Sequence, residues 1–162
     1  MEIIAEVGLA HDGSLTQAHA YIDACAKTGV DTVKFQCHLD DPCTEWRVRP
    51  SWPQESSRQA YWLRTGFTCS QWRGLAEHCR EMRVEFLCSP FSVQAVALLD
   101  PLVKRWKVPS GRVTDVALLD AIGKTAKPVL LSTGMSTLDE ATFATVRLNG
   151  YGCAVQLMQC TT

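Results

Sequence analysis

Short apolar runs alternate with helix-like stretches along the whole chain. Six runs rich in Val, Ile, Phe and Leu lack strict alternation, which is typical of strands buried on both faces of a parallel sheet. Predicted strands cover 2–7, 32–36, 84–88, 104–108, 128–132 and 153–160. Between them, apolar residues recur at helical spacing. Five helices are predicted. The first is capped by Ser14 and ended by Gly29, the second covers 70–82 with Ser70 as its cap, and the other three cover 92–100, 114–125 and 136–148.

This alternation predicts an α/β fold with parallel strands joined by right-handed crossovers. No G-x-G-x-x-G follows the first strand, which counts against a dinucleotide-binding unit. The repeat spacing of roughly 25–30 residues suits a (β/α) barrel, and a complete barrel needs eight units and about 250 residues. We therefore expect residues 1–162 to form a single, incomplete domain: a partial (β/α)8 TIM barrel of about six parallel strands.

One connection between predicted elements is much longer than the others. Residues 37–69 form a long, Trp-, Pro- and Ser-containing stretch between two predicted units. Long connections inside a domain are commonly lids or binding loops, so we expect this segment to cover a site.

Composition excludes several classes of function. The chain is 46% hydrophobic and 20% charged with a formal net charge of -1, which gives no electrostatic reason to expect nucleic acid as a partner. No apolar run approaches the ~18 residues that a membrane span needs, and the first residues lack the pattern of a signal peptide. The expected location is the cytoplasm.

Eight cysteines raise the question of disulfides or zinc. No C-x-x-C pair occurs, and a reduced protein is therefore the better interpretation. Five cysteines fall within apolar patterns and are expected in the core: Cys25, Cys79, Cys88, Cys153 and Cys160. Three lie in or beside the long connection and are expected to be exposed: Cys37, Cys43 and Cys69.

Polar residues gather where the predicted strands end. In a parallel sheet these ends share one edge, where ligands bind. The candidate site residues at or near these ends are Glu6, His11, Lys34, Gln36, Ser89, Lys107, Ser110 and Ser132.

The two lysines are the most informative of these residues. Lys34 and Lys107 are flanked by apolar residues, and a buried ammonium is costly unless it is paired or binds an anion. The same argument applies to Glu6. Two alternatives stay open: solvent-facing edge positions, or a purely structural network of ion pairs.

Hydroxyl and imidazole side chains are more ambiguous. Each of Ser89, Ser110 and Ser132 follows a strand and precedes a helix, where it can bind phosphate or simply cap the helix. Three such serines with two lysines favour an anionic ligand. His11 is a candidate metal ligand or sugar contact, or a loop histidine with local hydrogen bonds. His19 and His78 are expected to be solvated on helices, and His38 stays unassigned.

Several motifs together resemble one known family. The runs IIAEVGLAHDGSL, DTVKFQ, FLCSPF, KVPSG, KPVLLSTGMSTLDE and QCTT are similar, in order and spacing, to the N-acetylneuraminate (sialic acid) synthase family. The resemblance covers essentially the whole chain and implies a TIM barrel followed by a small antifreeze-like domain. It also implies condensation of phosphoenolpyruvate with N-acetylmannosamine or a related acylated sugar, giving a nonulosonic acid and phosphate, with Mn²⁺ or Mg²⁺ as cofactor.

The resemblance also implies roles for individual residues. Lys107, Ser89, Ser110 and Ser132 match the phosphoenolpyruvate-binding positions, and Lys34 matches a lysine beside that ligand. Glu6 matches the acidic residue at the sugar end, so Glu6 and Lys34 are the expected catalytic residues. His11 and Gln36 are candidate contacts on the sugar side.

Three departures from the family put activity in question. Arg112 stands where the family has a carboxylate, and Gln159 stands where it has a histidine. The two metal-binding histidines of the family fall beyond Thr162, so no metal ligand is expected in this chain. Alternatives are therefore a non-catalytic phosphate-binding or assembly protein, or another phosphoenolpyruvate-dependent sugar-acid synthase.

An open six-stranded sheet exposes two edges, and we therefore expect the chain to self-associate.

Overall fold

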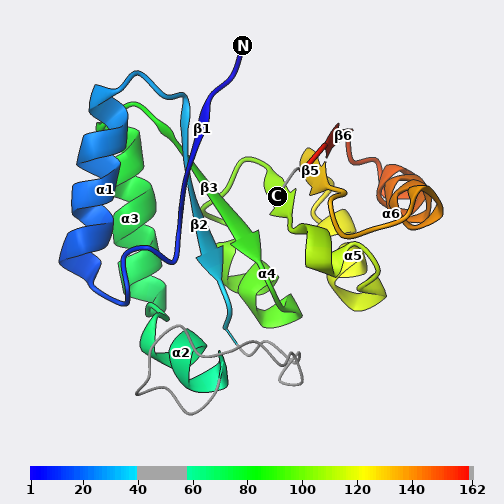
Figure 1. Ribbon diagram of the computed structural model, residues 1–162, viewed down its shortest axis with the longest axis horizontal. Helices are drawn as coiled ribbons and strands as arrows, with labels where there is room; N and C mark the ends of the chain where they lie inside the picture. The colour runs from blue at the N-terminus through cyan, green and yellow to red at the C-terminus, as the bar shows by residue number, and fades with distance from the viewer. Residues whose placement is uncertain (40–57, 161–162) are drawn as a thin grey trace.

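Six parallel strands form two sheets in the part of the chain that the computed structural model describes, residues 1–39 and 58–160 (Figure 1). The first sheet has the order β1–β2–β3 and the second has the order β4–β5–β6. All the pairs are parallel. The strands are β1 (Ile4–Gly8), β2 (Thr32–Cys37), β3 (Glu85–Pro90), β4 (Trp106–Val108), β5 (Val129–Ser132) and β6 (Val155–Met158).

Helices cover the outer side of both sheets. The helices are α1 (Leu15–Lys27), α2 (Arg58–Arg64), α3 (Cys69–Glu81), α4 (Val93–Leu99), α5 (Val116–Gly123) and α6 (Leu138–Gly150), with a 3-10 turn η1 (Ser110–Arg112) after β4. α1 and α3 lie side by side against the first sheet, and α5 and α6 lie side by side beside the second (Figure 1). This strand–helix order confirms the predicted α/β fold and the partial barrel.

The start of α3 differs from the prediction. Thr68, not Ser70, is the N-cap: its Oγ1 accepts a hydrogen bond from the backbone N of Gln71 at 3.3 Å. The Gln71 side chain in turn accepts from the backbone N of Thr68 at 2.8 Å, which completes a capping box. Such a reciprocal pair satisfies two helix-end donors, whereas a cap at Ser70 would satisfy one.

The predicted long connection contains a helix that its sequence did not signal. α2 occupies its second half, and residues 40–57 of the expected lid lie outside the described residues. α2 lies near the carboxyl ends of β1 and β2 (Figure 1).

An aromatic core fills the space between the first sheet and its helices. The Phe35 ring packs against Phe86 on the neighbouring strand, with centroids 5.9 Å apart, and against Trp72 of α3 at 6.2 Å. Since successive side chains of a strand point to opposite faces, Lys34 and Gln36 face away from these helices. This alternation sends the polar residues of β2 to the inner side of the partial barrel.

The seven described cysteines are all free thiols. Cys69 is exposed, as expected, but Cys37 is buried, so its predicted exposure is wrong. Cys37 shares the helix-facing side of β2 with Phe35, and burial raises the pKa of its thiol to about 11. Cys43 lies outside the described residues.

Among the residues that the structure describes, no helix is both long enough and apolar enough to cross a membrane.

Candidate functional site

Three predicted site residues meet at the carboxyl end of the first sheet. Lys34 on β2 forms an ion pair with Glu6 on β1. The same Nζ donates a hydrogen bond to Oγ of Ser89 on β3 at 3.3 Å. Lys34 and Ser89 are buried, whereas the Glu6 side chain is 47% exposed. Three neighbouring strands thus hold one ammonium group between a carboxylate and a hydroxyl.

The second sheet contributes a matching pair. Lys107 on β4 donates hydrogen bonds to Oγ of Ser132 on β5 and to the carbonyl oxygen of Val108, the latter at 3.1 Å. Lys107 and Ser132 are both buried. Burial is the main cause and the nearby positive charge of Lys34 the second cause of a pKa of Lys107 that is lowered to about 8.

The two groups form one cationic cluster, because the positive charge of Lys34 acts on Lys107. We call it the lysine cluster; its members are Glu6, Lys34, Ser89, Lys107 and Ser132. Two ammonium groups face one carboxylate, and that carboxylate is already paired with Lys34. A buried cation without an ionic partner favours binding of an anion, and two serine hydroxyls lie beside it as hydrogen-bond donors. The arrangement is suited to a small ligand that carries phosphate or carboxylate groups.

A bulge in β1 sets the position of Glu6. The register with β2 shifts between Glu6 and Gly8, and Gly8 has φ +56°. This positive φ favours glycine, and a Cβ atom at Gly8 would lie 2.9 Å from Oε1 of Glu6, so the Glu6 carboxylate would have to move. Gln36 donates from Nε2 to the same Oε1 at 3.2 Å, and its own Oε1 lies 3.2 Å from Nε2 of His38.

The turn after β5 brings an unexpected thiol to the cluster. A Cβ atom at Gly134 would lie 2.5 Å from the Cβ of Cys160, so glycine lets Cys160 approach this turn. A hydrogen bond with Ser132 lowers the pKa of the Cys160 thiol, and the charge of Lys107 adds to this effect. Cys160 was expected in the core. Its position two residues after the end of β6, at the same end of the sheet as Ser132, was the available signal.

His11 lies apart from this cluster. Its ring packs on Phe67 with centroids 4.6 Å apart and lies 6.1 Å from the ring of Phe35, on the helix-facing side of β2. Nδ1 accepts a hydrogen bond from the backbone N of Gly13 at 3.1 Å, while Nε2 has no hydrogen-bond partner among the described residues. Burial lowers the pKa of His11 to about 4. This position does not support the expected sugar contact or metal ligation.

The residues after β4 carry the main departure from the family pattern. Ser110 opens η1 and is half-buried. Arg112 is buried, and its Nη1 lies 3.2 Å from the carboxylate of Asp115. Its guanidinium also lies 5.8 Å from the ring centre of Phe91. A buried, ion-paired cation thus occupies the position where the resemblance implies a carboxylate.

His19 and His78, which were expected to be solvated, are only partly exposed. Their Nδ1 atoms lie 2.7 Å apart between α1 and α3, and Nε2 of His78 is 3.0 Å from Asp23. Both rings are partly buried where the two helices pack.

Gln159, which stands where the family has a histidine, is exposed. Its Nε2 donates a hydrogen bond to the carbonyl oxygen of Cys160 at 3.2 Å.

The described part of the chain holds no cluster of metal ligands. In residues 1–39 and 58–160, no group of three or more His, Cys, Asp or Glu side chains is placed to hold a metal ion. The divalent metal that the resemblance implies stays a prediction.

Comparison with known proteins decides the family. Residues 21–162 match the model of the NeuB family. The chain belongs to the NeuB family. It is 32% identical over 170 residues to the N,N'-diacetyllegionaminic acid synthase of Campylobacter jejuni subsp. jejuni serotype O:2, covering 99% of this chain and 51% of that protein. It is 30% identical over 148 residues to the N-acetylneuraminate-9-phosphate synthase of Homo sapiens, covering 85% of this chain and 40% of that protein.

Solved structures agree on the fold of this NeuB-family chain. The sialic acid synthetase of Leptospira borgpetersenii serovar Hardjo-bovis superimposes with a TM-score of 0.83 at 23% identity, over 99% of this chain and 54% of that one. The spore coat polysaccharide biosynthesis protein SpsE of Bacillus subtilis gives a TM-score of 0.77 at 28% identity, over 99% and 44%. The chain thus spans about half the length of the relatives that it matches.

Proposed function

We propose that this chain supplies the phosphoenolpyruvate-binding part of a nonulosonic acid synthase. The observation that carries the proposal is the pair of buried lysines, Lys34 and Lys107, each hydrogen-bonded to a strand-end serine at the carboxyl edge of the sheets. Synthases of sialic and legionaminic acids among the relatives support sugar-acid synthesis as the reaction class.

The charges of phosphoenolpyruvate match this cluster. In the proposed reaction, the CH₂ carbon of phosphoenolpyruvate bonds to the aldehyde carbon of an acylated amino sugar such as N-acetylmannosamine, and the aldehyde oxygen takes up a proton. Water loses a proton as it adds to the carbon that carries the phosphate, and phosphate leaves as its bond to that carbon breaks, which gives the 2-keto acid. Lys107 and Ser132 would hold the phosphate, and Lys34 and Ser89 would hold the carboxylate beside it. The fixed ammonium groups would stabilise the negative charge on the departing phosphate.

Glu6 is suited to the sugar end. Its side chain is half exposed, while Gln36 and Lys34 fix the position of its carboxylate. A carboxylate held in this way can accept hydrogen bonds from sugar hydroxyls, or hold a proton near the aldehyde oxygen. Ser110, at the start of η1 after β4, is assigned to the phosphoenolpyruvate side on the resemblance alone.

One observation favours a second function, binding without turnover. Arg112 is buried and paired with Asp115, and an arginine stays protonated at neutral pH. It cannot act as the general base that a carboxylate would provide at this position. In this alternative, the chain retains the anion pocket and serves as a phosphate-binding or assembly protein.

Location and association complete the proposal. The free thiols of the described residues suit the reducing cytoplasm. Within the described residues, the outer edges of β1 and β6 are unpaired. Ile3, just before β1, is 53% exposed, and Leu157 in β6 is 52% exposed. Unpaired strand edges with apolar residues favour pairing with another chain, so we include self-association.

Two assays on the chain separate the alternatives. Phosphate release is measured with phosphoenolpyruvate, N-acetylmannosamine and Mn²⁺, and phosphoenolpyruvate binding is measured by calorimetry. Turnover together with binding supports the synthase. Saturable binding without turnover supports the pocket-only function, and the absence of both overturns the site assignment.

A further inference from the structure

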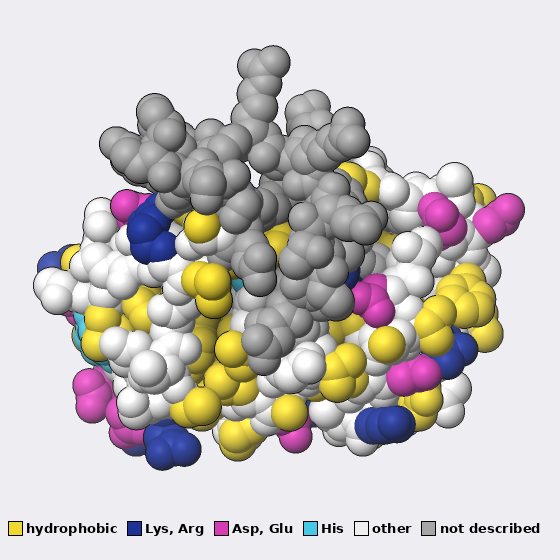
Figure 2. Space-filling view, turned by 90° about the horizontal axis from the view of Figure 1, so that it is seen from below, with side chains coloured by type: hydrophobic (Ala, Val, Ile, Leu, Met, Phe, Trp, Pro, Cys, Tyr) yellow, Lys and Arg dark blue, Asp and Glu magenta, His cyan; other side chains and the backbone are white. Residues whose placement is uncertain are grey.

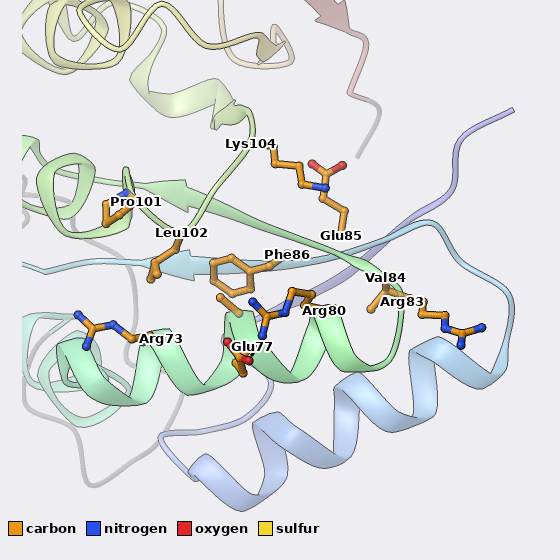
Figure 3. Close-up of a pocket in the computed structure, with 11 residues that line it drawn as sticks. Arg73, Glu77, Arg80, Arg83, Val84, Glu85, Phe86, Pro101, Leu102 and Lys104 are labelled. Carbon is orange, nitrogen blue, oxygen red and sulfur yellow. Dashed lines mark hydrogen bonds and ion pairs between the residues drawn. The ribbon is translucent and has the colours of Figure 1, made fainter.

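A concave site lies on the outer surface, away from the lysine cluster. An open groove of about 440 Å³ runs between α3 and the segment that joins α4 to β4. Its floor is apolar: Ala76, Val84, Phe86 and Leu102. Figure 3 shows the Phe86 ring between α3 and Leu102. Phe86 lies near the start of β3, whereas Ser89 of the lysine cluster lies near its end, so the two sites are at opposite ends of that strand.

The groove lies where both layers of the fold are interrupted. α1 packs on α3, and α4, α5 and α6 pack on one another in sequence, but α3 and α4 share little contact. The sheet is interrupted at the same place, because β3 belongs to the first sheet and β4 to the second. Because α3 and α4 hardly touch and β3 does not pair with β4, an unfilled groove is left between them.

The rim of the groove is cationic. Four basic side chains and two acidic ones line it, for a formal charge of +2: Arg73, Arg80, Arg83, Lys104, Glu77 and Glu85. Both acids already have partners, since Glu77 pairs with Arg80 and Glu85 pairs with Arg105 from outside the groove. Among the described residues, Arg73, Arg83 and Lys104 form no ion pair.

We propose that this groove binds a small phosphomonoester with an apolar or planar body. A phosphomonoester carries a charge of about -1.5 to -2 at neutral pH, which matches the charge of the rim. Guanidinium groups bind phosphate oxygens in a bidentate way, and the apolar floor offers a surface for the body of the ligand. The volume is in the range typical of small-molecule sites, about 300–1,000 Å³. A soluble molecule of this size therefore fits better than an extended acidic chain.

The test is an NMR titration of the ¹⁵N-labelled chain with four probes: adenosine monophosphate, adenosine, inorganic phosphate and hexaglutamate. The proposal predicts saturable shifts of the Ala76, Phe86 and Leu102 amide signals with adenosine monophosphate. Adenosine, inorganic phosphate and hexaglutamate should each bind at least about tenfold more weakly. Adenosine lacks the phosphate group, and the other two lack the planar body. Absence of saturable shifts at these residues, or equally tight binding of hexaglutamate, overturns the proposal.

Three variants show where adenosine monophosphate binds. The double variant Arg73→Gln/Lys104→Gln should weaken binding of adenosine monophosphate by at least about tenfold. Lys27→Gln/Lys124→Gln removes the same charge from exposed positions outside the groove and should leave binding unchanged. Ser132→Asp, which disrupts the lysine cluster, should also leave it unchanged. Equal loss in both double variants, or loss in Ser132→Asp, contradicts a site in the groove.

Discussion

Lys107 on β4 donates a hydrogen bond to Ser132 on β5, and both side chains are buried at the carboxyl edge of the second sheet. The nearest carboxylate of the cluster, Glu6, is paired with Lys34 instead. Lys107 therefore keeps a buried positive charge without a carboxylate of its own among the described residues, and this charge is the basis of the predicted anion binding.

Affinity for phosphoenolpyruvate should fall as pH rises through about 8, because burial lowers the pKa of Lys107 to about 8. At pH 9 only about one-tenth of such groups stay protonated, so the dissociation constant should be about tenfold higher than at pH 7. Calorimetry at both pH values measures this change.

Lys107→Met supplies the control for this pH dependence. The variant should bind weakly at both pH values, and its residual affinity should not change between them. A wild-type affinity that is constant from pH 7 to 9 would contradict the assignment of Lys107 to the ligand.

His11 should make the fold sensitive to acid. Its pKa is lowered to about 4 by burial, from the ordinary value of 6.5, so the unfolded chain binds more protons than the folded chain between these values. The contribution of His11 to stability is complete above pH 6.5 and is lost as pH falls to 4, at a cost of about 2 to 3 kcal/mol.

Urea unfolding of His11→Phe measures this contribution. The free energy of unfolding of the variant should decrease less between pH 6.5 and pH 4 than that of the wild type. The same decrease in both proteins would show that His11 is not buried in its neutral form.

Gly8→Ala should destabilise the fold by about 1–3 kcal/mol, because φ +56° is strained for alanine and the new Cβ would lie 2.9 Å from Oε1 of Glu6. Gly74→Ala is the matched control. Gly74 lies within α3 with no atom within 4 Å of a built Cβ, and alanine there should stabilise by about 0.5–1 kcal/mol. Thermal and urea unfolding compare the two; a neutral Gly8→Ala would argue against the bulge.

Leu157→Lys should reduce self-association, because it places a charge on the edge strand β6, which pairs with β5 on one side only within the described residues and where Leu157 is 52% exposed. Val146→Lys introduces the same charge on α6 at a residue that is 65% exposed and should leave association unchanged. Sedimentation velocity at micromolar concentration compares these variants with the wild type. A monomeric wild type would rule out the association itself.

Seen from the end where β1–β3 terminate, hydrophobic side chains extend across the middle of the molecule and most charged side chains lie toward its periphery (Figure 2). Lys34 and Lys107 differ from these charged side chains, because both are buried.

The positions of Lys34 and Lys107 follow from strand alternation and from the common direction of the strands. Their meeting with Ser89 and Ser132 could therefore be predicted from sequence alone.

Other features depend on contacts that periodicity does not encode. His11 follows β1 at the ligand end, yet it packs among Phe35 and Phe67, because the turn after the bulge directs it to the helix side. The 2.7 Å contact of His19 with His78 depends on how α1 packs against α3. The groove depends on the poor contact of α3 with α4, which no local sequence pattern records.

The central claim is that the cluster around Lys107 and Ser132 binds the phosphate of phosphoenolpyruvate. The most direct test is calorimetric titration of Ser132→Asp beside the wild type and Ser136→Asp, which adds the same charge close to the N-terminus of α6 but outside the cluster. Saturable binding by the wild type and by Ser136→Asp, with none by Ser132→Asp, is the predicted result. Equal affinity of Ser132→Asp and the wild type would contradict the claim.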